Sequence, residues 1–226
     1  MFIFWHKGTK KWIIDNFLVF LQQIIGMLEV KDATIAVGGQ IIATGLSFMA
    51  RDHQLTCITG PEGSGKTRLL RTLMGFLPVG SGFVSVDGEL LTVKSSQAFR
   101  RMMVYLPQQM QMLRHQLESP EAPVYEAGDF GFWSPLPPKA VVATSPSPLS
   151  PDEIFRLAEQ TLQTASDKQI IIADEPAARL TPELAERMLQ LLQDQVDAGK
   201  TVLIASRRPL LVDHADLVIE MNQNSY

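Results

Sequence analysis

An α/β fold with a mainly parallel sheet is the fold class that the sequence predicts, with a smaller antiparallel β-subdomain at its start. From residue 54 onward, short apolar runs alternate with segments whose apolar residues repeat at helical spacing. Before residue 52, two strand-like runs flank the Gly38-Gly39 pair, which is typical of a hairpin turn. Strands that alternate with helices form parallel sheets covered by those helices, whereas a hairpin pairs its two strands antiparallel.

The strands are predicted from apolar or alternating runs that end in turn residues. In chain order we expect them over 27–37, 40–50, 54–60, 83–88 (a strand and its turn), 102–109 (a strand that runs into a loop), 169–176, 201–206 and 216–221. Residues 169–176 include three consecutive isoleucines, which is typical of a parallel strand buried on both faces. We find no internal repeat.

Helices are predicted over 67–77, 152–165 and 182–197. In the first, Leu69, Leu70, Leu73 and Met74 form the inner face. Residues 118–151 differ, because they hold eight of the 14 prolines of the chain. Proline removes a backbone donor and fixes φ, so this stretch is expected to be an irregular loop or a reduced subdomain.

Composition indicates one globular domain, or a core with a small subdomain. The 226 residues are 46% hydrophobic and 19% charged, which excludes a disordered chain. The net charge of −4 argues against nucleic acid as a partner, and Arg100 and Arg101 are interpreted as a solvated helix face. The single cysteine, Cys57, excludes an internal disulfide, fits a reducing compartment and is expected to be a buried packing residue.

The N-terminal residues 1–26 are expected to form an amphipathic extension. Apolar residues over 10–25 repeat at helical spacing, which predicts a helix that packs on the domain or on a partner. Docking of this helix on a membrane surface is the alternative. Met27 as the natural start is a further possibility. No run of about 18 apolar residues is present, so no membrane span is predicted.

The segment GPEGSGKT, residues 60–67, carries the clearest chemistry. It matches the phosphate-loop pattern G-x-x-x-x-G-K-[ST] and lies between a predicted strand and a predicted helix. Its glycines let backbone amides point at phosphate oxygens, and the helix N-terminus adds positive charge. Lys66 is expected to reach the β- and γ-phosphates, and the Thr67 hydroxyl to hold Mg²⁺. The nucleotide-binding residues predicted here are Gly60, Pro61, Glu62, Gly63, Ser64, Gly65, Lys66, Thr67 and Arg68.

The segment IIIADEP, residues 170–176, supplies a second set of candidate groups. Asp174 is expected at the carboxyl end of a buried strand, where its carboxylate can bind the metal through water. Glu175 follows and is placed to polarise an attacking water as a general base. The alternative for both residues is an acidic pair in a turn before Pro176.

Both motifs, their order and the gap of about a hundred residues resemble the ATP-binding cassette (ABC) ATPases. YLPQ, residues 105–108, is similar to that family's Q-loop, with Gln108 expected to contact Mg²⁺ and the attacking water. The resemblance covers about residues 27–221. It implies a RecA-like P-loop NTPase core, an antiparallel β-subdomain and a reduced helical subdomain over 109–165, all within a domain over 27–226. It also implies a second cassette as partner, because the family hydrolyses ATP between two facing cassettes.

The chain departs from the family at the signature LSGGQ, where residues 149–153 read LSPDE. No glycine occurs between Gly131 and Gly199, so realignment does not restore the signature. Ser150, Pro151 and Glu153 instead predict a capping box at a helix start, which we favour over a working signature. Acidic side chains there would also repel a triphosphate.

Three further departures concern single positions. Val37 stands near the place of the family's adenine-stacking aromatic residue, and Thr181 replaces the D-loop aspartate. Arg207 replaces the switch histidine. Two roles are open for Arg207, namely contact with the γ-phosphate and an exposed charge at a strand end. Arginine can neutralise a phosphate, but it does not release its proton.

The function predicted is the ATP-binding subunit of an ABC-type transporter that binds MgATP and hydrolyses it weakly or only with a partner cassette. Lys66, Gln108 and Glu175 are the candidate catalytic residues, and Thr67, Gln108 and Asp174 the candidate metal ligands. The expected partners are a second cassette and a membrane-spanning subunit, at the inner face of the membrane. The alternative is a regulatory or scaffold module that binds nucleotide without hydrolysis. DNA-repair ATPases are disfavoured, because the chain has no long coiled-coil insertion or basic face.

Overall fold

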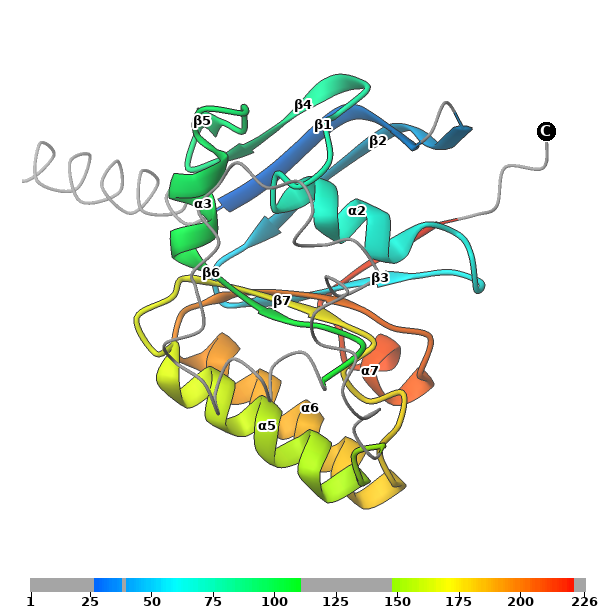
Figure 1. Ribbon diagram of the computed structural model, residues 1–226, viewed down its shortest axis with the longest axis vertical. Coiled ribbons are helices and arrows are strands. Elements are labelled where there is room, and N and C mark those ends of the chain that lie inside the picture. Colours follow the sequence, from blue (N-terminus) through cyan, green and yellow to red (C-terminus); the bar gives the residue numbers. More distant parts are fainter. Residues whose placement is uncertain (1–26, 38–39, 111–147, 222–226) are drawn as a thin grey trace, which may run out of the picture.

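The computed structural model describes residues 27–37, 40–110 and 148–221, which form two sheets with helices between and below them (Figure 1). The predictions for residues 1–26, for the Gly38-Gly39 turn and for most of the proline-rich segment lie outside these residues. None of the helices in the described part is long and apolar enough to cross a membrane.

The smaller sheet is antiparallel and has the strand order β2-β1-β4-β5. Its strands are β1 (Met27–Val37), β2 (Gln40–Arg51), β4 (Ser81–Val86) and β5 (Glu89–Leu90). The pairs Met27↔Arg51 and Val37↔Gln40 show that β1 and β2 form the predicted hairpin. A second tight turn joins β4 to β5 through Asp87 and Gly88, whose φ values of 52° and 77° are those of a hairpin turn.

The larger sheet is parallel throughout and has the strand order β6-β7-β8-β3-β9. Its strands are β3 (Gln54–Thr59), β6 (Met103–Leu106), β7 (Ile170–Asp174), β8 (Thr201–Ala205) and β9 (Leu217–Glu220). All residues of β7 and β8 are buried, as the continuous apolar runs predict. These two sheets confirm the predicted α/β fold class.

Helix α2 (Lys66–Leu73) lies between the two sheets (Figure 1). Its inner face, Leu69, Leu70 and Leu73, is fully buried, as predicted. This face packs in one cluster with Val30 of β1 and Ile172 of β7. The helix therefore joins the antiparallel sheet and the parallel sheet in a single core.

Helices α5 (Pro151–Thr164), α6 (Pro182–Asp197) and α7 (Pro209–Asp213) cover the other face of the parallel sheet (Figure 1). The first two lie within one residue of their predicted ranges, whereas α7 was not predicted. A separate cluster, which includes Phe155, Leu162, Leu192 and Cys57, forms the core on this side. The burial of Cys57 confirms its predicted packing role.

Helix α3 (Ser96–Met102) precedes β6 and corrects the interpretation of its two arginines. Arg101 is exposed, as expected. Arg100 is not a solvated residue, because its guanidinium lies 4.8 Å from the centre of the Phe76 ring and donates to the Met74 carbonyl at 3.3 Å. Its long side chain covers the end of α2, which the charge pattern alone does not reveal.

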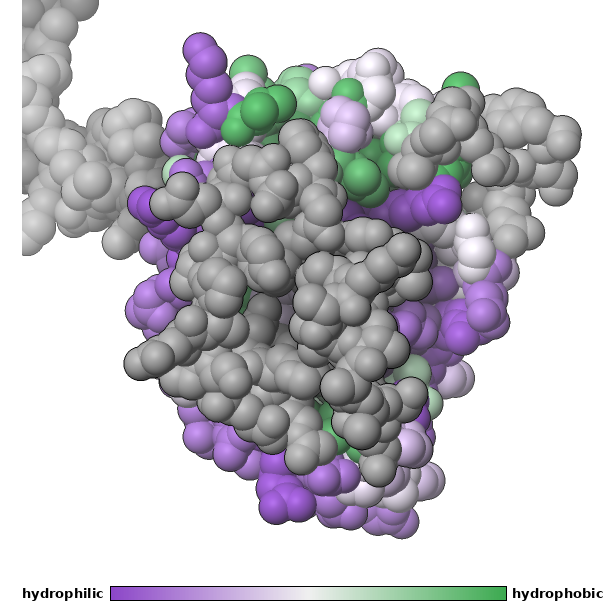
Figure 2. Space-filling view, in the orientation of Figure 1, coloured by the Kyte–Doolittle hydropathy of each residue, from purple (hydrophilic) through white to green (hydrophobic). Residues whose placement is uncertain are grey.

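Apolar side chains reach the surface mainly over the antiparallel sheet, at the top of Figure 2. Ile41 of β2, Leu90 of β5 and the nearby Val93 are the large ones there, at 48%, 52% and 90% exposure. The surface at the opposite end of the view, over α5 and α6, is predominantly hydrophilic (Figure 2). The two ends of the molecule thus differ in the surface they offer.

Candidate nucleotide site

The candidate site lies where the parallel strands end at their carboxyl termini. The phosphate loop follows β3, Gln108 follows β6, Asp174 ends β7 and Arg207 follows β8. Ligands of open parallel sheets bind at this edge. A cavity of about 380 Å³ is present there, a size suited to a small ligand. Its lining residues are Glu62, Gly63, Gly65, Lys66, Thr67, Arg68, Gln108, Asp174, Glu175 and Arg207.

Glycine is required at two turns of the phosphate loop. Gly60 and Gly65 have φ values of 144° and 92°, which L side chains rarely adopt. A Cβ at Gly60 would collide with the Met221 carbonyl oxygen, and one at Gly65 with the Ile42 side chain from β2. The loop therefore packs closely against the backbone that follows β9 and against β2.

Lys66 is the first residue of α2 and lies under the phosphate loop. Its ammonium donates to the Gly60 carbonyl at 2.8 Å and to the Pro61 carbonyl at 2.9 Å. The side chain is 7% exposed, and burial lowers its pKa while the nearby Glu175 carboxylate opposes that change. An ammonium has three donors, so one more can be directed at a phosphate oxygen.

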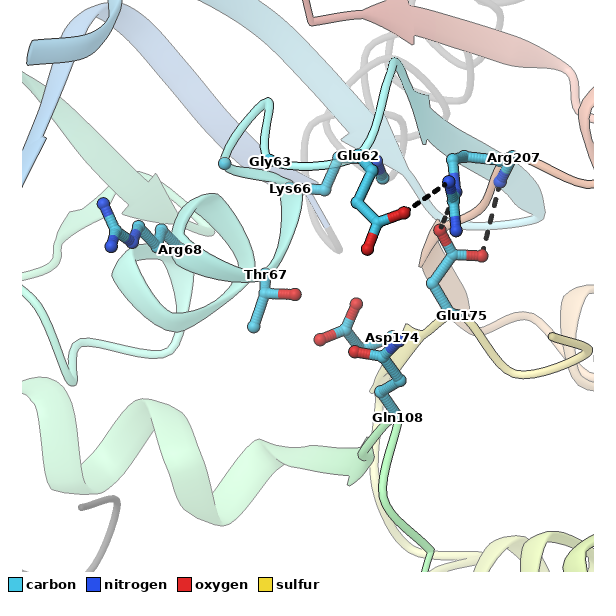
Figure 3. A pocket seen from close by; sticks show the side chains of 10 residues that line it. Glu62, Gly63, Lys66, Thr67, Arg68, Gln108, Asp174, Glu175 and Arg207 are labelled. Atoms are coloured by element: carbon cyan, nitrogen blue, oxygen red, sulfur yellow. Dashed lines mark hydrogen bonds and ion pairs between the residues drawn. The ribbon is translucent and has the colours of Figure 1, made fainter. Parts of the chain in front are cut away.

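Asp174 is a buried carboxylate at the wall of the pocket. It is 1% exposed, and its Oδ1 is buried without a hydrogen-bond partner among the described residues. The Tyr105 hydroxyl donates to its Oδ2 at 3.4 Å. Burial raises the pKa of Asp174, and the Thr67 hydroxyl beside it opposes this rise. An orphaned carboxylate oxygen facing a hydroxyl and the Gln108 amide suits an oxygen-binding cation such as Mg²⁺ (Figure 3).

Glu175 has an uncommon backbone conformation at the edge of the pocket. Its φ is 49°, in the left-handed region, and its N–H donates to the Ala205 carbonyl at 2.8 Å. A non-glycine residue in this region costs about 1–3 kcal/mol, and such residues gather at functional sites. The conformation brings the carboxylate, whose side chain is 9% exposed, to the pocket wall.

Arg207 contacts two carboxylates of the pocket (Figure 3). Its Nε lies 3.3 Å from Glu175 Oε1, and its backbone N–H donates to Glu175 Oε2 at 3.4 Å. A terminal nitrogen of the same guanidinium lies 3.3 Å from the Glu62 carboxylate. Arg207 is exposed at a strand end, one of the two alternatives left open, but the sequence did not predict these ion pairs. Contact with a phosphate stays a prediction.

The neighbouring Arg208 binds the loop that follows Glu175. Its guanidinium donates to the Ala177 carbonyl at 2.5 Å and to the Leu180 carbonyl at 3.1 Å. Arg207 and Arg208 together therefore attach the loop after β8 to both ends of the segment that carries Glu175. Two consecutive arginines after a buried strand are the only sign of this in the sequence.

The segment LSPDE forms the predicted capping box at the start of α5. Ser150 Oγ accepts from the Glu153 N–H at 3.3 Å, and the Glu153 carboxylate accepts from the Ser150 N–H at 2.8 Å. The Ser150 hydroxyl also donates to that carboxylate at 2.9 Å. The hydroxyl and the backbone N–H of Ser150 are thus both engaged within its own helix.

Thr181 has a similar local role at the start of α6. Its hydroxyl accepts from the Leu184 N–H at 3.3 Å, as an N-cap residue does. The side chain of Val37 lies outside the described residues. The Thr181 hydroxyl is thus engaged within its own helix start.

Most of the predicted site residues meet at the pocket. Gly60, Pro61 and Ser64 shape the phosphate loop but do not line the cavity. Arg68 lines its rim, with its side chain directed away from the carboxylates (Figure 3). Within the described part of the chain, no group of three or more histidine, cysteine or acidic side chains forms a metal cluster.

The comparisons with known proteins identify ABC transporters. A family model described as ABC transporter matches residues 43–178. A lipid A-core flippase of Xanthomonas oryzae pv. oryzae, described as ATP-dependent, is 27% identical over 92% of this chain and 38% of its own length. A putative ABC transporter ATP-binding protein of Treponema denticola is 31% identical over 77% of this chain and 36% of its own length. The chain thus spans less than two fifths of either relative.

Solved structures show the same fold. A nucleotide-free ATP-binding cassette from an ABC transporter superposes with a TM-score of 0.64 at 18% identity, over 89% of this chain and 90% of that one. A bacterial Atm1-family ABC exporter with ATP bound gives a TM-score of 0.62 at 15% identity, over 89% of this chain and 38% of the exporter.

Proposed function

The chain belongs to the ABC transporter family of ATP-binding domains, and on this premise we propose that it binds MgATP and hydrolyses it weakly or only with a partner cassette. One observation carries the proposal. Most of the groups proposed to hold nucleotide within one chain line a single pocket, whereas Ser150, which would serve a facing cassette, is engaged in its own helix cap.

Each pocket residue has a proposed role. Residues 60–68 hold the phosphates, with Lys66 as a cation for the terminal ones. Thr67, Gln108 and Asp174 hold Mg²⁺ through oxygen atoms. MgATP, when bound, supplies the phosphoanhydride bond and a metal that polarises its terminal phosphate. Glu175 accepts the proton of the attacking water, for which its carboxylate must separate from Arg207.

We propose two kinds of partner. A second cassette with an intact signature sequence would complete the site over Lys66 and Glu175. A second copy of this chain would serve poorly, because Asp152 and Glu153 place negative charge where a facing triphosphate needs donors. A membrane-spanning subunit is the other partner, and it places the chain at the inner face of the membrane. The domain is proposed to extend over 27–226, with 109–165 as a reduced helical subdomain.

The alternative is a nucleotide-binding scaffold without hydrolysis. Arg207 contacts both carboxylate oxygens of Glu175, so the candidate base is occupied in this structure. If the ion pair persists with ATP bound, ATP binding changes the conformation of the domain or its affinity for a partner, but the ATP is not hydrolysed.

Binding and phosphate release measured together test the proposal. The full chain is titrated with ATP, with and without Mg²⁺, and phosphate release is followed for the chain alone and mixed with candidate partner cassettes. Lys66→Ala should weaken binding, and Glu175→Gln should retain binding while abolishing release. Glu89→Gln, an exposed glutamate of β5, is the matched control.

Two outcomes would change the conclusion. Saturable MgATP binding without turnover, alone or with partners, would favour the scaffold. Failure of the folded chain to bind ATP at millimolar concentration would refute the proposal itself.

A further inference from the structure

Three side chains from three loops form a chain of ion pairs across the mouth of the pocket (Figure 3). Glu62 comes from the phosphate loop, Glu175 from the end of β7 and Arg207 from the loop after β8. Arg207 lies between the two carboxylates, at 3.3 Å from each. We call these three residues the ion-pair latch.

The two carboxylates differ in environment. The Glu175 side chain is 9% exposed, whereas that of Glu62 is 87% exposed and points into the pocket (Figure 3). Screening by water makes the Glu62 pair weak and easily exchanged, while the partly buried Glu175 pair is screened less. A ligand anion can therefore displace Glu62 from Arg207 first.

The position of the latch relates it to the third phosphate. Amides of a phosphate loop hold the first two phosphates at the start of the following helix, and the loop lysine reaches the second and third. Here that helix is α2, and the latch lies on the opposite side of the pocket from Thr67 (Figure 3). We therefore expect the third phosphate of a nucleoside triphosphate to lie toward the latch, and a diphosphate to end nearer α2.

We propose that Glu62 and Arg207 set the preference of this pocket for nucleoside triphosphate over diphosphate, by competition between the terminal phosphate and two carboxylates for one guanidinium. This inference rests on the proposed function and deepens it. Glu62 acts against the triphosphate in two ways, as a rival partner of Arg207 and as a nearby negative charge. Arg207 acts for the triphosphate, because guanidinium pairs well with phosphate oxygens.

The same exchange connects nucleotide choice with the candidate base. When the terminal phosphate takes Arg207, the Glu175 carboxylate loses its nearest cation and can accept a proton from water. A diphosphate leaves the Arg207–Glu175 pair in place. Arg207 is thus a specificity-determining residue that also positions Glu175.

Substitutions of Glu62 and of Arg207 are expected to change the ATP preference in opposite directions, which gives a sharp test. The affinities of the full chain for a fluorescent ATP and the corresponding ADP are measured with Mg²⁺, and their ratio is compared among variants. Glu62→Gln should raise the preference for ATP by about three- to tenfold, and Arg207→Gln should lower it by about tenfold. The double variant should depart from additivity by about threefold, because both residues act through one contact.

Matched controls separate the latch from general changes of charge. Glu89→Gln on β5 and Arg101→Gln on α3 alter the net charge equally but lie outside the pocket lining, so they should leave the ratio unchanged. A cooperative thermal unfolding transition shows that each variant is folded.

The results distinguish the two levels of inference. Absence of binding of either nucleotide to the wild-type chain would refute the proposed function and the latch with it. Normal binding in which either Glu62→Gln or Arg207→Gln keeps the ATP-to-ADP affinity ratio within twofold of wild type would refute the latch alone. Equal gains for ATP and ADP in Glu62→Gln would also refute it, because a nonspecific charge effect has no preference for the third phosphate.

Discussion

Replacement of Asp174 by asparagine should stabilise the protein without nucleotide and remove its response to Mg²⁺. Asp174 is 1% exposed, and its Oδ1 has no hydrogen-bond partner among the described residues. Burial raises the pKa of its carboxyl above the usual 3.8. A carboxyl with a raised folded-state pKa binds its proton more tightly in the folded protein, so its contribution to stability falls as the pH rises above 3.8. Near pH 7 the ionised group therefore opposes folding.

The size of the effect follows from the burial of this group. A buried polar group without a partner costs about 1–3 kcal/mol, and asparagine removes the charge while keeping the shape and an oxygen for the Tyr105 hydroxyl. The asparagine amide retains part of the cost, so we expect a gain of about 1 kcal/mol. In a domain of this length, that gain raises the melting temperature by about 2–4 °C.

Thermal unfolding followed by circular dichroism measures both halves of this prediction. In EDTA, Asp174→Asn should melt above the wild type, whereas the exposed Asp213→Asn should melt with it. With MgATP the wild type should gain stability by mass action, and Asp174→Asn should gain much less. A variant that melts more than about 2 °C below the wild type in EDTA would refute the reasoning, as would an undiminished response to Mg²⁺.

Three further predictions concern the loop, a helix cap and the single thiol. Gly65→Ala should abolish nucleotide binding in a direct titration, because its Cβ meets the Ile42 side chain at a φ of 92°; unchanged affinity would contradict the packing described. Ser150→Ala should lower unfolding free energy by about 1 kcal/mol through loss of the capping box, with ATP affinity unaffected, as denaturant titration would reveal. Burial raises the pKa of Cys57 to about 11, so at pH 8 iodoacetamide should label it only at the rate of unfolding; rapid labelling of the native chain would show that the thiol is accessible.

The parts of the site that depend on neighbouring residues could be predicted from the sequence. Glycines at fixed spacing before a helix are enough to predict the phosphate loop. An apolar run with an acidic end is enough to predict the buried strand that leads to Asp174 and Glu175. The capping box is equally local, since Ser150 and Glu153 are one helical turn apart. Most helix and strand positions followed from the same short-range patterns, whereas the short helix α7 did not.

The ion pairs of the latch could not be predicted this way. Glu62 and Arg207 are far apart in sequence and meet only because β3 and β8 are adjacent in the sheet. Arg100 illustrates the same limit, because a charged residue on a short helix looks solvated until Phe76 from another segment lies against it. Strand order and side-chain direction decide such contacts, and neither is encoded in a local pattern.

The place of α2 between the two sheets has a consequence for cooperativity. Because its buried face contributes to one cluster with both sheets, the antiparallel sheet cannot open without exposing apolar surface of the helix that begins at Lys66. Strands β1, β2 and β4 and the phosphate loop therefore open together, as one cooperative unit. A ligand that holds that loop will slow amide hydrogen exchange throughout a sheet that contributes no residue to the pocket lining.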